Sequence, residues 1–372
     1  MHLNNQYILS PCGTSLLTNQ CEDQNERKLV YIHANKKEAA DIKKVDRERL
    51  EELIGKVSKN IESANNQEAA RMSAELNGIV QLYNGKALPD NDFHFLLSTD
   101  TWLGYETAKL VEKWLRTRNH KLATLVHRQR DLRTDDLSSF QLSLTELITK
   151  FDEELSAYKK KGHKIVFNLT GGFKSIQGFL QSIANFYADE VVYIFETSSA
   201  LMRIPRLPVR LDLDRVIEEN LAVFRNLFHG LPVFKAEKMP EIFLFTMDSE
   251  TMLSPWGKLV FSKSKKEIYR KRLLPSPSPE KIQYAALFER DVKTLPPDRV
   301  ELVNHRIDQL NKYLDNHAIN PPSLDFKQLK GKAMKVSTHE IDAWSDLDAK
   351  RIFGHFEKDG SFVLDKLDKG LH

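Results

Sequence analysis

The sequence predicts an α/β protein made of two folded parts, and three observations support this prediction. The chain has 372 residues, of which 41% are hydrophobic and 29% charged, so it is long enough for two domains. In residues 1–212, short apolar runs alternate with amphipathic helical stretches, which is typical of a doubly wound, mainly parallel sheet. In residues 279–372, one helical stretch precedes several strand-like runs, which predicts a small α+β domain with a curled antiparallel sheet.

The first part contains alternating strand and helix patterns along its whole length. The apolar runs predicted as strands cover residues 7–9, 29–33, 93–97, 122–126, 165–168 and 191–195. The stretches with helical spacing cover residues 45–61, 68–83, 104–118, 143–160 and 171–187. Because ligands bind beyond the carboxyl ends of the strands in such sheets, the polar segments that follow the strands are candidate binding loops.

One of these segments is more specific than the others. The run 164–168 leads into Thr170-Gly171-Gly172-Phe173-Lys174 and then into a helical pattern. The glycines permit a tight turn, and the first N–H groups of the following helix can face an anion. Phe173 separates Gly172 from Lys174, so the segment is not an ATP-binding Walker A loop. We therefore expect a nucleotide-like site without ATPase chemistry.

Small hydroxyl residues also follow other predicted strands, at 10–15, 98–99 and 196–198. Serine and threonine at such places commonly cap the next helix, and for any single segment we prefer that interpretation. Combined with the Thr-Gly-Gly segment, they favour a ligand site.

Residues 213–278 are predicted to connect the two parts. A helix is expected over 213–227 and strands over 242–246 and 256–262. The segment 258–272 holds seven Lys or Arg residues and one acid, so it is either a solvated helix face or a docking surface for RNA or an acidic partner. The segment 274–279, with three prolines, predicts an extended linker at a domain boundary.

In the C-terminal part we expect strands over 282–288, 324–329, 333–337, 351–356 and 362–367, and a helix over 298–316. Asp359-Gly360, flanked by alternating apolar residues, predicts a hairpin turn.

Bulk properties exclude several classes of protein. The net charge of +3 does not indicate a general nucleic-acid binder. Cys12 and Cys21 have no partner cluster, so we expect reduced thiols and no metal site. The first residues show no signal-peptide pattern and no run is long enough to span a bilayer, so we expect a cytoplasmic protein without membrane contact.

Residues 5–212 resemble the CARF domains of CRISPR-associated proteins, which are Rossmann-like sensors of cyclic oligoadenylates. The resemblance rests on three blocks, at 10–15, 168–174 and 191–208. It implies a homodimer that binds one cyclic ligand, usually cyclic tetra-adenylate, across its two-fold axis. The residues that the resemblance places at the ligand are Gly13, Thr14, Ser15, Thr170, Gly171, Gly172, Lys174, Glu196 and Ser198.

Residues 279–372 resemble the RelE-like messenger-RNA interferases, through the blocks 282–296, 324–331 and 351–372. This resemblance implies a metal-independent endoribonuclease that needs no cofactor and cleaves mRNA in the ribosome, with the ribosome and mRNA as partners. Such cleavage needs a base for the ribose 2′-OH, a cation for the phosphorane and an acid for the leaving oxygen.

The candidate catalytic residues are cationic or can titrate. They are Lys327, Lys330, Lys332, Arg351, His355, Lys358 and His372. Arg351 matches the family's strand arginine and is assigned to phosphate stabilisation, while Lys330 and Lys332 suit base or phosphate roles. Crowding of like charges would lower a lysine pKa and allow it to act as a base, and His372 is a candidate acid.

Three alternatives stay open at this level. A HEPN ribonuclease could use Arg299 and His305, although the strand-rich tail argues against an all-helical domain. A non-enzymatic regulator would control a binding tail instead of cleaving RNA. A ring nuclease would mainly degrade the cyclic ligand.

Overall fold

The computed structural model describes residues 5–195, 200–207, 214–233, 236, 238–329, 335–346 and 348–370. The chain forms two compact units, unit 1 (Met1–Arg210) and unit 2 (Leu211–His372). Among the described residues, no helix combines the length and apolar character needed to cross a membrane.

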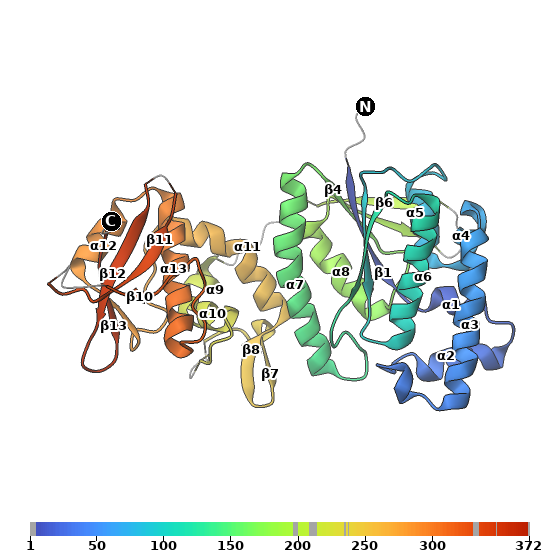
Figure 1. The fold of residues 1–372 in the computed structure, drawn as a ribbon, viewed down its shortest axis with the longest axis horizontal. Helices are drawn as coiled ribbons and strands as arrows, with labels where there is room; N and C mark the ends of the chain where they lie inside the picture. The colour runs from blue at the N-terminus through green and yellow to red at the C-terminus, as the bar shows by residue number, and fades with distance from the viewer. Residues whose placement is uncertain are drawn as a thin grey trace. The chain divides into compact units, whose positions relative to one another are not determined.

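Unit 1 contains a six-stranded sheet between two layers of helices (Figure 1). Its strands are β1 (Gln6–Cys12), β2 (Phe93–Ser98), β3 (Ala123–Arg128), β4 (Lys164–Asn168), β5 (Glu190–Ile194) and β6 (Leu201–Pro205). They are ordered β3-β2-β1-β4-β5-β6, with β1 to β5 parallel and β6 antiparallel to β5. The predicted α/β fold with a mainly parallel sheet is confirmed.

The helices of unit 1 cover both faces of this sheet. They are α1 (Ser15–Thr18), α2 (Gln24–His33), the short 3-10 helix η1 (Ala39–Asp41), α3 (Lys44–Ser63), α4 (Asn66–Met72), α5 (Ala74–Leu82), α6 (Trp102–Arg118), α7 (Leu137–Lys160) and α8 (Lys174–Tyr187). Side chains of β1 alternate between the two layers, as the period of a strand requires. Ile8 joins the core cluster that contains Val111 of α6, and the Tyr7 ring contacts the Tyr158 ring of α7 at 4.7 Å.

Two predictions for unit 1 are wrong. The run 29–33 is the end of helix α2. Asp23 caps the start of this helix, because its side chain accepts hydrogen bonds from Asn25 N and Glu26 N. A short apolar run fits a strand or a buried helix equally well, so the cap upstream decides. The predicted helix 68–83 is two helices, because Ser73 is extended (φ −150°) and caps α5.

Unit 2 combines a helical layer with a second sheet. Its elements are α9 (Asp214–Glu219), α10 (Leu221–Phe228), the 3-10 helix η2 (Glu241–Phe243), β7 (Leu244–Met247), β8 (Glu250–Leu253), α11 (Pro255–Lys271), β9 (Ile282–Tyr284), α12 (Ala286–Lys293), α13 (Pro297–Asp315), β10 (Lys327–Gln328), β11 (His339–Trp344), β12 (Lys350–Phe356) and β13 (Phe362–Lys369). The β7–β8 pair forms a separate two-stranded sheet.

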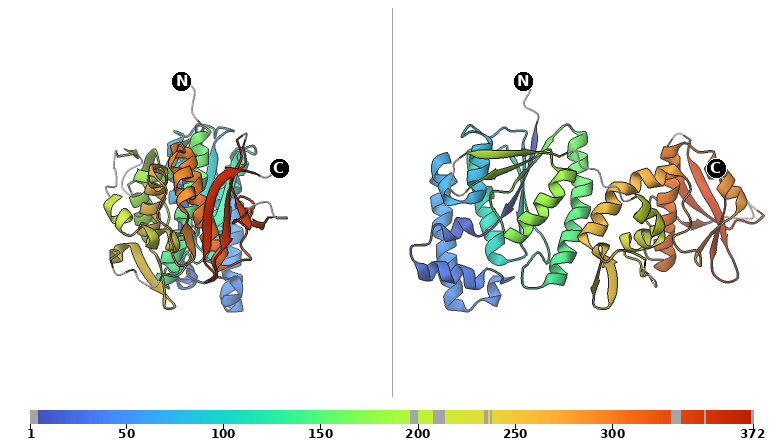
Figure 2. Two further views of the ribbon diagram at one scale, coloured as in Figure 1. Left: turned by 90° about the vertical axis from the view of Figure 1, so that its left-hand side faces the viewer. Right: turned by 180° about the vertical axis from the view of Figure 1, so that it is seen from behind.

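The larger sheet of unit 2 has the order β10-β11-β12-β13-β9. Its pairs are antiparallel except for β13 with β9, which are parallel, so the antiparallel prediction holds for most of the sheet. Helix α13, predicted at 298–316, lies along one face (Figure 2), and its Ile307 shares a core cluster with Ile352 of β12. The predicted β12–β13 hairpin is confirmed, with Gly360 at φ +89° in the turn.

Several element boundaries in unit 2 differ from the prediction. The run 256–262 lies in helix α11, which Ser254 caps by accepting a hydrogen bond from Gly257 N at 3.2 Å. The run 282–288 ends as a strand at Tyr284, where α12 follows. The run 242–246 contains η2 before β7 begins. In these places the apolar runs are short enough to fit either the helix or the strand period.

The predicted strands 324–329 and 333–337 also change. The first is reduced to the two residues of β10. Residues 333–334 lie outside the described residues, 335–337 form no strand, and the next strand, β11, begins at His339.

The proline-rich segment 274–279 is not a free linker, because it packs inside unit 2. Leu274 is buried, and the segment's carbonyl groups accept hydrogen bonds from α10. Arg225 Nη1 donates to Pro275 O at 2.6 Å and Asn226 Nδ2 to Pro277 O at 2.8 Å. Proline lacks an N–H but keeps its carbonyl, so buried side-chain donors can fix such a segment.

Candidate functional site

The loops after β1 and β4 meet at the centre of the sheet in unit 1. These strands are neighbours, and the strand order continues in opposite directions on either side of them. A Cβ added to Gly13 would lie 3.5 Å from Gly172 Cα, so the two glycine loops touch. This point is where ligands bind in open α/β sheets. The structure thus brings together the loop 13–15 and the loop 170–172.

A buried carboxylate, Glu75 of α5, connects the two loops. Its Oε1 accepts hydrogen bonds from Gly13 N at 2.8 Å and Gly172 N at 3.1 Å. Its Oε2 accepts from Ser15 Oγ at 2.8 Å and Ser73 Oγ at 2.6 Å. Glu75 is only 1% exposed, so the hydrogen bonds replace its lost hydration.

Sequence analysis missed Glu75. The residue lay inside a predicted continuous helix, and only the break at Ser73 brings it to a helix start. The available signal was a possible N-cap serine, Ser73, followed within one turn by an acidic residue, Glu75. The Thr-Gly-Gly loop accommodates the carboxylate, because a Cβ on Gly171 would lie 2.3 Å from Glu75 Cδ. Gly172 is at φ +98°, a conformation that favours glycine.

The other predicted ligand residues differ in their surroundings. Thr14 precedes α1 without using its side chain as a cap. Thr170 Oγ1 is buried without a hydrogen-bond partner in the described part of the chain and faces α5, where a Cβ on Gly78 would lie 2.7 Å away. Lys174 is exposed at the start of α8. Glu196 and Ser198 lie outside the described residues.

Three of the predicted catalytic residues, Lys327, Arg351 and His355, lie on the sheet face opposite the core cluster that contains Ile352. In β12, Arg351 lies two residues before Phe353 and His355 two residues after it, so all three side chains lie on the same face of the sheet. Lys327 of β10 pairs with Glu340, which pairs with Phe353, so Lys327 belongs to the same face. The structure therefore brings three of the predicted residues to one face.

This face also holds carboxylates that pair with the cations. Arg351 Nη1 lies 3.0 Å from Asp325 Oδ2 and contacts Asp342 Oδ1. Lys327 Nζ lies 2.7 Å from Asp325 Oδ2 and 3.5 Å from Glu340 Oε1. The expected crowd of like charges is thus an array of alternating charges.

The alternating charges reverse one expectation. The hydrogen bond to Asp325 raises the pKa of Lys327, whereas crowding was expected to lower it, so Lys327 is a poor base. The hydrogen bond that His355 Nδ1 donates to Asp365 Oδ2, at 2.9 Å, raises the pKa of His355. A histidine with a raised pKa is better suited to donate a proton than to accept one.

Of the other candidates, only Lys358 lies among the described residues. Lys358 is exposed in the turn between β12 and β13. Lys330, Lys332 and His372 lie outside the described residues.

The basic run 258–272 lies mostly on α11, and part of its charge is paired within unit 2. Lys258 Nζ lies 3.7 Å from the centroid of the Phe228 ring. Lys271 Nζ is 3.2 Å from Glu218 Oε1, and Arg270 Nη1 is 3.6 Å from Glu301 Oε2. These contacts favour the solvated helix face over an uncompensated positive patch for this part of the run.

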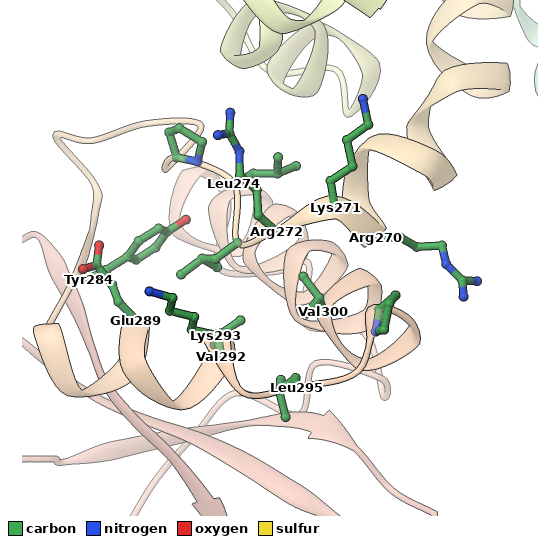
Figure 3. A pocket seen from close by; sticks show the side chains of 13 residues that line it. Arg270, Lys271, Arg272, Leu274, Tyr284, Glu289, Val292, Lys293, Leu295 and Val300 are labelled. Carbon is green, nitrogen blue, oxygen red and sulfur yellow. The ribbon is translucent and has the colours of Figure 1, made fainter.

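The end of the basic run lines a groove of about 780 Å³. Its walls are segment 270–275 on one side and α12 with the start of α13 on the other (Figure 3). The groove is mostly apolar and carries Arg272 and Lys293, which form no ion pair among the described residues.

Arg299 and His305, the pair considered for a HEPN site, have separate partners. Arg299 Nη1 lies 2.8 Å from Asp346 Oδ2, and His305 packs its ring 4.9 Å from that of Tyr269. Burial lowers the pKa of His305 to about 4. The two residues therefore form no joint site.

A protein-family model matches part of the chain. The model of the CRISPR-associated protein family Cas_APE2256 matches residues 70–207. The matched segment runs from α4 to β6 and includes Glu75 and the loop 170–172. This match supports a CRISPR-associated protein. No curated protein is significantly similar to the chain.

Proposed function

We propose that the protein is a cyclic-oligoadenylate-activated, ribosome-dependent endoribonuclease of CRISPR antiviral signalling. Unit 1 is the CARF sensor and unit 2 the RelE-like effector, and the active form is a homodimer through unit 1. The observation that carries the proposal is the contact between the loops 13–15 and 170–172, at the place where a nucleotide ligand binds in this type of sheet. The family match over 70–207, which includes the second loop, supports the CRISPR context.

The ligand is a cyclic oligoadenylate, with cyclic tetra-adenylate as the first to test. Lys174 and the free N–H groups of the first turn of α8 suit a phosphodiester. The Gly13 and Gly172 N–H groups, by contrast, already donate to Glu75. Phosphate contacts are therefore expected at the α8 end of the site.

In unit 2, Arg351 would stabilise the phosphorane and His355 would protonate the leaving 5′-oxygen. The first role requires Arg351 to exchange Asp325 and Asp342 for the RNA phosphate, to which a guanidinium binds in a bidentate manner. The second follows from the raised pKa of His355. The raised pKa of Lys327 leaves Lys330 and Lys332 as the candidate bases among the predicted lysines.

Docking on the ribosome is assigned to the end of the basic run 258–272, where Arg272 lines the groove and forms no ion pair among the described residues. The expected partner is acidic, since the run is positive overall. If neutralising this run left ribosome binding unchanged at all salt concentrations, the assignment would be wrong.

The decisive experiment is mRNA cleavage in a reconstituted translation reaction, with and without cyclic tetra-adenylate and with naked RNA in parallel. Ligand-dependent cuts confined to ribosome-bound mRNA would support both halves of the proposal. Equal cutting of naked RNA would favour a HEPN-like activity.

A non-enzymatic regulator is the second candidate, because the cations of the proposed catalytic face are paired with carboxylates. Absence of cutting with every ring size, together with ligand-dependent binding of a partner, would favour it. Loss of the cyclic ligand itself in the same reaction would instead indicate a ring nuclease.

A further inference from the structure

We infer that Glu75 is a positioning residue of the sensor site, which holds the loops after β1 and β4 at the spacing that the ligand requires. The inference rests on the proposed function, because it takes these two loops as the ligand-binding loops. It adds a residue that neither the sequence patterns nor the family match assigns to the site.

Glu75 accepts hydrogen bonds from two loops that are far apart in the chain. Glu75 accepts four, and three of the donors belong to the two loops: Gly13 N, Ser15 Oγ and Gly172 N. Gly13 and Gly172 lie 62 and 97 residues from Glu75 in the chain, so the contacts are purely tertiary. Hydrogen bonds to an ionised acceptor are about twice as strong as neutral ones. One side chain thereby fixes two otherwise independent loops.

The helix that carries Glu75 is packed rigidly into the core of unit 1. Glu75 stands in the first turn of α5, and Leu76 and Ile79 of this helix are fully buried in the same core cluster as Ile8 and Val166. Those two residues belong to β1 and β4, the strands that carry the loops. The carboxylate is therefore fixed to the same rigid body as the strands, which is how a site is pre-organised.

Holding the two loops is a different role from contacting the ligand directly. A carboxylate has about four lone-pair sites, and Glu75 uses four with donors of the chain. The residue is 1% exposed, and its negative charge would repel a phosphodiester. Glu75 thus acts through the loops that it holds.

The test uses the full chain and three variants. Glu75→Ala removes all four contacts, whereas Glu75→Gln keeps an oxygen that can accept from Gly13 N and Gly172 N. Leu155→Ala is the matched control, because Leu155 is buried near the end of α7. Helix α7 leads to the start of β4, so this residue lies toward the amino ends of the strands, away from the two loops at their carboxyl ends. Calorimetry measures the affinity for cyclic tetra-adenylate, and hydrogen exchange measures the protection of the Gly13 and Gly172 amides.

We expect Glu75→Ala to weaken binding at least about tenfold, to accelerate exchange of both amides, and Glu75→Gln to stay within about threefold of the wild type. Leu155→Ala should lower stability without changing affinity. Unchanged affinity in Glu75→Ala, an equal loss in Leu155→Ala, or tighter binding by Glu75→Gln would overturn the inference.

The two levels of the proposal fail in different ways. If the wild type binds no cyclic oligoadenylate of any ring size, the proposed function fails. The exchange measurement then still decides on the loop-holding role, since unchanged protection of Gly13 and Gly172 in Glu75→Ala would refute it.

Discussion

Each unit contains a carboxylate that is almost completely buried, and the two are stabilised in different ways. In unit 1, Glu75 is held by two N–H groups and two hydroxyls, all of them uncharged. In unit 2, Asp308 of α13 is held by a cation: Arg225 Nε lies 2.7 Å from its Oδ1, and both side chains are 1% exposed.

The charged partner of Asp308 determines the pKa of this carboxyl. Burial alone would raise the pKa of Asp308, but Arg225, together with His229 and Tyr269, outweighs this effect and lowers it to about 2. Arg225 also donates to Pro275 O, so the ion pair joins α10, α13 and the proline-rich segment. Unit 2 thus uses a buried ion pair to fix its architecture, whereas unit 1 uses neutral donors to fix loops at a candidate site.

The largest effect is expected for Asp308→Asn, which leaves the Arg225 charge buried without a counter-charge. Breaking such a pair costs about 3–5 kcal/mol in the free energy of unfolding of unit 2. The measurement is urea unfolding followed by a signal from unit 2. Asp315→Asn is the control: its pair with Lys281 (2.8 Å) is partly exposed and should contribute less than about 1 kcal/mol.

The same pair predicts a dependence on acid. The pKa of Asp308 is lower in the folded chain than its ordinary value of 3.8, so its stabilisation is present above that value. It is lost as the pH falls through the folded value of about 2. Asp308→Asn should remove this part of the acid unfolding profile; an identical profile in both proteins would contradict the ion-pair interpretation.

Arg351→Ala tests whether the charges of unit 2 are catalytic as well as structural. If Arg351 stabilises the phosphorane, ribosome-dependent cleavage should fall about 10²–10³-fold, the usual loss for such a group. Arg351→Lys keeps the charge but not the planar fork, so its loss should be intermediate.

Arg299→Ala is the control for Arg351→Ala, because Arg299 also pairs with carboxylates, Asp346 and Asp348, and is not on the proposed catalytic face. Cleavage rates in the reconstituted translation reaction compare the three variants. Equal rates for Arg351→Ala and the wild type would exclude the proposed role and favour a regulator.

Gly172→Ala, with Gly85→Ala as its control, tests how tightly the loop after β4 is packed in unit 1. Both glycines have positive φ, +98° and +68°, but a Cβ at Gly172 would lie 2.8 Å from Pro11 Cβ, whereas the space at Gly85 is open. We expect a loss of about 1 kcal/mol for Gly85→Ala from the backbone alone. Gly172→Ala should lose about 2–4 kcal/mol, since overpacking adds to the strain.

Thermal unfolding of unit 1 measures both glycine variants. Equal losses at the two positions would show that the close packing at Pro11 relaxes without cost.

The smallest effect is the pH dependence of His355. Its pKa is raised by Asp365, so its contribution to stability is complete below the ordinary value of 6.5 and is lost as the pH rises through the folded value. An NMR titration of the His355 ring should show a raised midpoint in the wild type and a lower midpoint in Asp365→Asn, in which Glu357 still raises the pKa. A normal midpoint in both would remove the argument for His355 as the acid.

Sequence patterns predicted the parts of the fold in which local signals agree. Helices α3, α6 and α13 have long amphipathic periods, and the β12–β13 hairpin combines alternation with Asp359-Gly360. The short apolar runs at 29–33 and 256–262 were wrongly predicted as strands, because so few residues do not distinguish the period of a helix from that of a strand.

At the candidate site, the Thr170-Gly171-Gly172 loop could be predicted from the residue pattern alone, because backbone freedom is a local property of glycine. It also identified Lys327, Arg351 and His355 by charge and titration. The groups that these residues contact follow from the folded arrangement and not from local patterns. Glu75 reaches Gly172 across 97 residues, and Asp325 reaches Arg351 across 26. Hydrogen bonds and ion pairs depend on distances of about 3 Å, and these are set by how strands and helices pack, not by the order of residues in the chain.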